Sequence, residues 1–231
     1  MIMTLIAYRN ELLYRISQRL SRRRPNWDRI METAAPLFES SNVPTGGKLA
    51  EMHLRVALEE INDELEARDR VVFDPISHDD STRNYYFTNY ESGLRVLRKS
   101  DGQVYSEIDD IVVVDGLPVL FEIKTGKNYR KSPSNRRKGA SLGAKHAMEA
   151  GRMEYLLHPI KECFGTSVCG YVLVIPPEHI VPTFQHQQRF RLSGGLLVPL
   201  YTDAESYKGE VSRRISDYER ANPTSLQRLA N

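Results

Sequence analysis

The spacing of apolar residues along the chain separates predicted helices from predicted strands. In several segments, leucine and isoleucine recur every three or four positions, which is the repeat of a helix with one buried face. The clearest stripe consists of Leu54, Leu58, Ile61 and Leu65. Helices are therefore predicted within the first twenty residues, after Trp27, and over residues 48–67, 142–157 and 204–221.

Short runs of β-branched and aromatic residues between these helices predict strands. The strongest prediction is a hairpin within 103–124, where two apolar strands flank Asp115-Gly116, because Asp-Gly supplies the positive φ angles of a tight turn. Other strands are expected at 70–73, 84–88, 94–97, 169–175 and 196–200. The order of elements from 48 to 175 is helix, strands, hairpin, helix, strand, which predicts an α/β fold.

Composition narrows the class of protein. The chain has 231 residues, of which 40% are hydrophobic and 27% charged, enough for a sizeable core. It contains no apolar run of eighteen residues, so no membrane span is expected. The arginines in the first twenty residues do not suit a secretory signal, and two cysteines cannot form a disulfide framework. An intracellular location is expected.

Charge is unevenly distributed although the net charge is only +2. Residues 1–24 carry six arginines against one acid, and residues 51–80 carry ten carboxylates against three arginines. Directly after the hairpin comes a basic loop, 127–138, which either contacts phosphates or is a solvated linker. Its cations are Lys127, Arg130, Lys131, Arg136, Arg137 and Lys138.

The hairpin is predicted to bring two carboxylates together. If it closes symmetrically on Asp115-Gly116, Asp109 lies opposite Glu122, with Lys124 on the same face and Asp110 on the other. Like charges at this distance are unfavourable for stability alone. A register slip of one residue would exchange the two faces.

A third acid, Glu51, precedes the apolar stripe of the helix at 48–67. Three converging carboxylates beside a lysine are typical of a site for a hard divalent cation, Mg²⁺ or Mn²⁺. Zinc is not indicated, because the six histidines include no HxxxH pair.

These residues resemble a known family. Glu51 four residues after Gly47, Asp109 in Glu-Ile-Asp, and Glu122-Ile-Lys124 look like the motifs of PD-(D/E)xK nucleases, over residues 46–175. Residues 121–126 are similar to the motif of RecB-type exonuclease domains. The following glutamine and tyrosine motif and the cluster cysteines of that branch are not matched, so a generic endonuclease or resolvase is expected.

The resemblance implies a restriction-endonuclease-like core of helix, β-meander, helix and strand at 46–180. Residues 1–45 would be a helical extension, and 181–231 an extension with a strand and a helix. These extensions would shape substrate choice or the formation of a homodimer. It also implies that Asp109, Glu122 and the Ile123 carbonyl bind the metal, with Glu51 binding directly or through water. Lys124 would orient and help deprotonate the attacking water. The expected substrate is nucleic acid, DNA rather than RNA, and no membrane partner is expected.

Other interpretations remain open. The chain could be a nucleic-acid-binding module or complex subunit that keeps the nuclease fold without catalysis, or an interaction protein with fortuitous acids. At the level of residues, Glu107 and Lys124 could form an ordinary cross-strand salt bridge on a solvated hairpin face. Glu51 could be a first-turn acid favoured by the helix dipole, and His53 could replace it as the helix ligand.

Overall fold

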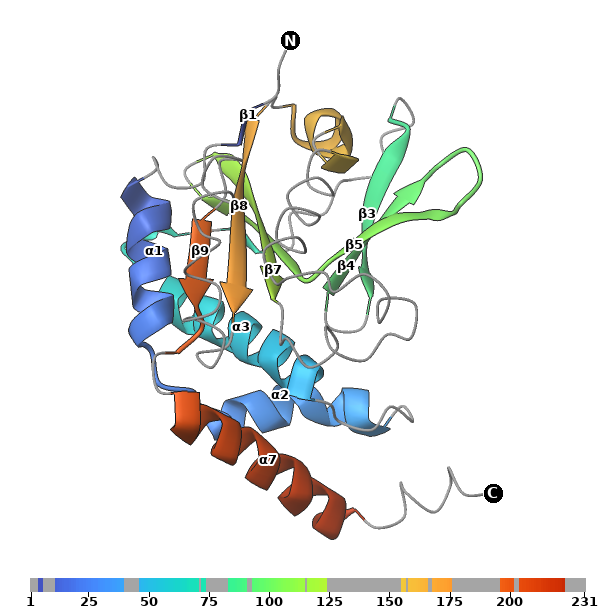
Figure 1. The fold of residues 1–231 in the computed structure, drawn as a ribbon. Coiled ribbons are helices and arrows are strands. Elements are labelled where there is room, and N and C mark those ends of the chain that lie inside the picture. The colour runs from blue at the N-terminus through green and yellow to red at the C-terminus, as the bar shows by residue number, and fades with distance from the viewer. Residues whose placement is uncertain are drawn as a thin grey trace, which may run out of the picture.

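The computed structural model has a mixed α/β fold (Figure 1). Its helices include α1 (Glu11–Arg22), α2 (Trp27–Glu39), α3 (Gly46–Asp63), the short 3₁₀ turn η1 (Ala67–Asp69) and α7 (Ala204–Ala221). Residues 155–156 and 158–164 are also helical. The structure describes residues 4–5, 11–39, 46–70, 72–73, 83–90, 93–114, 116–123, 155–156, 158–165, 168–175, 196–201 and 204–222.

Six strands in the described part of the chain form a central sheet in the order β1-β8-β7-β6-β2, with β9 also paired to β8. Strand β6 is antiparallel to β2 and β7, whereas β8 is parallel to β7, β9 and β1. The carboxyl ends of β7, β8 and β9 therefore lie at one edge of the sheet, above α3 in the view of Figure 1. The strands are β1 (Thr4–Leu5), β2 (Val72–Phe73), β6 (Asp110–Val114), β7 (Leu117–Ile123), β8 (Val168–Ile175) and β9 (Leu196–Pro199).

A second, three-stranded antiparallel sheet consists of β3 (Tyr85–Tyr90), β4 (Gly93–Arg98) and β5 (Val104–Ile108). Asp109 is the single residue between β5 and β6, so the chain passes from the small sheet to the central sheet at this acid. The predicted hairpin strand is thus divided between two sheets. Within the described residues, Glu107 pairs with Arg95 of β4, whose Nε donates to Glu107 Oε1 at 2.9 Å. Its pairing with Lys124 stays a prediction, because Lys124 lies outside the described residues.

The central sheet is buried on both faces. On one face, α3 packs through Leu54 and Leu58 against Val119 and Phe121. On the other face, Leu120 and Ile111 pack with helical and small-sheet side chains, among them Leu156, Ile160, Phe87 and Val96. Helix α1, part of the expected N-terminal extension, contributes Leu12, Leu13, Ile16 and Leu20 to the α3 side of the core. This packing fixes which side of the hairpin faces α3.

The structure agrees with most predicted elements and moves several boundaries. The strands at 169–175 and 196–200 and the helix over 204–221 are confirmed. The first helix spans Glu11–Arg22, and Leu5, which was expected in it, pairs with Cys169 of β8 as a strand. The predicted helix over 142–157 lies outside the described residues, apart from 155–156, which are helical.

Three arginines of α1 and its C-terminal end are paired with acids in the last turn of α3 and just after it. Arg15 lies 2.9 Å from Asp69, Arg19 lies 3.5 Å from Glu64, and Arg23 contacts Glu60 at 3.3 Å. The charge of these three arginines is therefore compensated within the chain, which disfavours their use as a phosphate-binding surface. No helix in the described ranges is long and apolar enough to cross a membrane.

Candidate functional site

The β6–β7 hairpin has the register that the sequence predicts. Val114 pairs with Leu117, Val112 with Val119, and Asp110 with Phe121, around a turn in which Gly116 has a φ of +70°. The turn needs glycine at this position, since other side chains rarely adopt a positive φ. Continuing the same register by one residue places Asp109 across from Glu122, on the face opposite to that of Asp110.

Asp110 faces α3, where it forms a buried ion pair with Arg55. The Nη1 atom of Arg55 donates to both of its carboxylate oxygens, at 3.1 and 3.2 Å, and the Ile111 N–H donates to Oδ1 at 2.8 Å. Arg55 also donates to Glu59 one turn further along α3. Asp110 is only 4% exposed, so this guanidinium compensates a buried charge. Asp110 is therefore engaged on the α3 side of the hairpin.

Asp109 is held at the carboxyl end of β7. Its Oδ2 atom accepts a hydrogen bond from the Ile123 N–H at 2.6 Å. Hydrogen bonds to an ionised acceptor are short and strong, so this contact fixes the carboxylate beside the peptide that joins Glu122 to Ile123. An acid from the β5–β6 junction is thereby brought to the Glu-Ile-Lys triplet.

Glu122 is the most buried acid of the described residues, with 1% exposure. It lies in β7, between β6 and β8, where Leu173 is its neighbour on β8. A carboxylate buried to this degree must be compensated by hydrogen bonds or a cation. Its oxygens and those of Asp109 are hard donors of the kind that Mg²⁺ and Mn²⁺ prefer.

Glu51 lies at the margin of the apolar stripe of α3. Its side chain is 22% exposed, and its Oε2 accepts a hydrogen bond from Lys48 Nζ at 3.0 Å. The side chain is thus partly buried, and the interpretation of Glu51 as a first-turn acid is wrong, since α3 already begins at Gly46. In the part of the chain that the structure describes, no three His, Cys, Asp or Glu side chains form a group that could hold a metal ion. The convergence of Glu51 with Asp109 and Glu122 stays a prediction.

Two parts of the predicted site lie outside the described residues. One is Lys124, which directly follows the end of β7. The other is the basic loop with Lys127, Arg130, Lys131, Arg136, Arg137 and Lys138. Their roles stay predictions.

His53 belongs to an aromatic cluster. Its ring stacks on Tyr207 of α7 at a centroid distance of 5.5 Å and lies 6.0 Å from the ring of Trp27. His53 Nδ1 is 3.2 Å from the Tyr207 hydroxyl. Burial lowers the pKa of His53 to about 3, so the ring is neutral at physiological pH. The alternative in which His53 replaces Glu51 as a ligand is not supported by this position.

The buried His53 predicts that the protein loses stability in acid. The folded-state pKa is about 3 and the ordinary value is 6.5, so below pH 6.5 the unfolded chain binds a proton that the folded chain does not. Between pH 7 and pH 4.5, the free energy of unfolding of the wild type should fall by roughly 2–3 kcal/mol more than that of His53→Gln. Urea unfolding at the two pH values measures this difference. His158→Gln, the same substitution at an exposed histidine, is measured beside it. Equal losses in all three proteins would contradict the prediction.

No protein-family model matches the chain, and comparisons with curated proteins and with solved structures gave no match.

Proposed function

We propose that this protein is a Mg²⁺- or Mn²⁺-dependent nuclease of the PD-(D/E)xK type that hydrolyses phosphodiester bonds, with DNA as its substrate. The observation that carries the proposal is the hydrogen bond from the Ile123 N–H to Asp109 Oδ2. It holds a carboxylate from outside β7 against the backbone of the Glu122-Ile-Lys124 triplet, where the family resemblance expects two acids and a lysine to meet.

The topology supports the same proposal. Helix α3 precedes the antiparallel strands β2, β6 and β7, and the helical residues 155–156 and 158–164 precede β8, which is parallel to β7. This is the order of helix, meander, helix and strand expected of a restriction-endonuclease-like core. In this reading, the sheet of β3, β4 and β5 is an insertion between the first and second strands of the meander.

The proposed chemistry assigns each group a separate task. Asp109, Glu122 and the Ile123 carbonyl would hold the cation, and Glu51 would assist directly or through water. A cation held by these groups would supply Lewis acidity, to activate a water and to neutralise charge on the phosphate. The burial of Glu122 strengthens its electrostatic interactions, because the surroundings are less polarisable than water. The ammonium of Lys124 would orient the attacking water and stabilise hydroxide.

Cleavage of labelled single-stranded, duplex and branched DNA, with RNA in parallel, tests the proposal. The wild-type protein should cleave at least one DNA substrate with Mg²⁺ or Mn²⁺ and none in EDTA. Cleavage that persists in EDTA would contradict a metal-activated water. Binding of these substrates without cleavage in either metal would favour the non-catalytic nucleic-acid-binding module instead.

A further inference from the structure

A pocket of about 380 Å³ lies between the α1–α2 connection and the beginning of α7. Its size is in the range of sites that bind one small molecule or one residue of a polymer. The lining residues come from two distant parts of the sequence: Arg24, Pro25 and Trp27 from one, and Tyr201, Ser206, Tyr207 and Glu210 from the other.

Three aromatic rings contribute to the wall of this pocket, beside polar and charged side chains. The rings of Trp27 and Tyr207 lie 5.7 Å apart at 38°, and Tyr201 adds a third ring. Tyr207 is 4% exposed and is stacked on His53, whose Nδ1 lies within hydrogen-bond distance of its hydroxyl. The wall is therefore fixed in place before any ligand binds, which lowers the entropic cost of binding.

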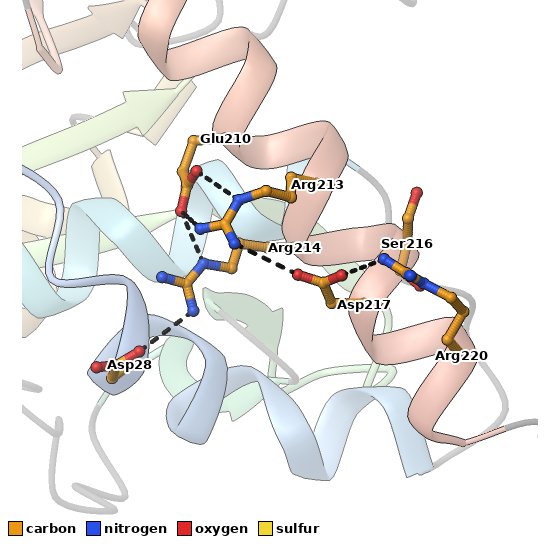
Figure 2. Close-up of polar contacts among 7 residues, drawn as sticks. All are labelled: Asp28, Glu210, Arg213, Arg214, Ser216, Asp217 and Arg220. Atoms are coloured by element: carbon orange, nitrogen blue, oxygen red, sulfur yellow. Dashed lines mark hydrogen bonds and ion pairs between the residues drawn. The ribbon is translucent and has the colours of Figure 1, made fainter.

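The acid in the pocket is already compensated. Hydrogen bonds from Arg213 and then Arg214 lower the pKa of Glu210 to about 2, although partial desolvation opposes the shift. Figure 2 shows both guanidiniums directed at Glu210, with Arg214 also reaching Asp28 of α2 and Arg213 reaching Asp217. A cationic ligand consequently finds no uncompensated carboxylate at this wall.

Arg24 places a positive charge in the lining of the pocket. It is exposed and makes no ion pair with any described residue, unlike Arg15, Arg19 and Arg23 of the same segment. The pocket therefore combines flat aromatic surface with one available guanidinium. A ligand with an aromatic plane and an attached anionic group, such as a nucleotide, fits that combination.

The position of the pocket relates it to the candidate nuclease site. Tyr201 comes two residues after the end of β9, and Glu122 lies next to the last residue of β7. Since β7, β8 and β9 are parallel neighbours, both residues lie at the carboxyl edge of the sheet, where the axes of β7 and β9 are about 10 Å apart. The pocket lies on the α3 side of the sheet and Glu122 faces the other side, so a strand that joins them would pass over this edge. A few nucleotides of a single strand span such a distance.

We propose that this pocket binds one unstacked nucleotide of the nucleic-acid substrate, with the base against Trp27 and Tyr201 and the phosphate on Arg24. The identity of the ligand as substrate strand rests on the proposed nuclease function. The binding itself requires no cleavage. It can therefore be measured in EDTA, where the two proposals give separate results.

Fluorescence of Trp27, the single tryptophan of the chain, reports directly from the pocket. Titration with a single-stranded DNA dodecamer in EDTA should quench this emission, and free dAMP should do so more weakly. Tyr201→Leu should raise the Kd for the dodecamer roughly 5- to 100-fold through lost stacking. Arg24→Ala should also weaken binding and reduce the slope of log K against log salt by about 0.7, the value for one phosphate contact on a single strand.

Arg22→Ala is the matched control, because Arg22 is also exposed, makes no ion pair with a described residue and does not line the pocket. It should leave the Kd near the wild-type value. Absence of quenching by the dodecamer, or equal weakening by Arg22→Ala and Arg24→Ala, would overturn the proposal. Quenching by dAMP alone would overturn the substrate-strand assignment and identify a site for free nucleotides. Quenching by the dodecamer in a protein that cleaves nothing would contradict the proposed nuclease function and support the proposed nucleotide-binding pocket.

Discussion

Replacing Glu122 by glutamine is expected to lower the rate of phosphodiester cleavage by at least about 10³-fold. The substitution keeps the shape of the side chain and removes the charge that would bind the cation. Glu122 is fully enclosed in β7, so an isosteric amide should leave the packing of the hairpin intact. Single-turnover cleavage with saturating Mn²⁺ measures the effect on the chemical step.

The control for this prediction is Glu107→Gln. Glu107 is an exposed acid of β5 that pairs with Arg95 on the small sheet, so the same chemical change is made outside the candidate site. It should change cleavage less than about twofold, since exposed ion pairs contribute little. Urea unfolding of both variants checks that the fold is retained. Cleavage at the wild-type rate by a folded Glu122→Gln protein would remove Glu122 from the mechanism.

Arg55→Met is expected to reduce the free energy of unfolding by about 3–5 kcal/mol. Asp110 is 4% exposed and receives two hydrogen bonds from Arg55, so loss of the guanidinium leaves a buried charge without its cation. The double variant Arg55→Met with Asp110→Leu should lose less than the single variant, because it removes the buried charge as well. Urea denaturation of the three proteins gives the coupling between the two residues.

Arg68→Met is the comparison for this effect. The Arg68 side chain is 78% exposed and pairs only with acids of its own turn, Glu66 and Asp69, in the described residues. Its loss should cost less than about 1 kcal/mol. Equal destabilisation by Arg55→Met and Arg68→Met would show that the Arg55–Asp110 pair is not a buried support of the hairpin.

The hairpin register could be predicted because local rules determine it. A tight Asp-Gly turn sets which residues face each other, and the two-residue period of a strand then separates Asp109 from Asp110. The division of 103–114 between two sheets could not be read in this way. Pairing of β5 with β4 depends on residues that the local pattern of the hairpin does not contain.

The environment of Glu51 and the aromatic pocket could not be predicted from the sequence, for a related reason. The periodicity of α3 identified its apolar face, but the start of the helix at Gly46 and the Lys48 contact decided where Glu51 lies. The pocket joins Trp27 to Tyr201 and Tyr207, which are far apart in the chain. The one available signal was a single tryptophan two residues after Arg22-Arg23-Arg24-Pro25.

Calorimetric titration with Mn²⁺ tests the central claim most directly, because it requires no knowledge of the substrate. The wild type and Glu107→Gln should show saturable heats of binding, whereas Asp109→Asn and Glu122→Gln should lose them, since these two carboxylates are the proposed ligands. Wild-type protein that binds no Mn²⁺, or binds it equally well after both substitutions, would contradict a metal-dependent nuclease built on Asp109 and Glu122.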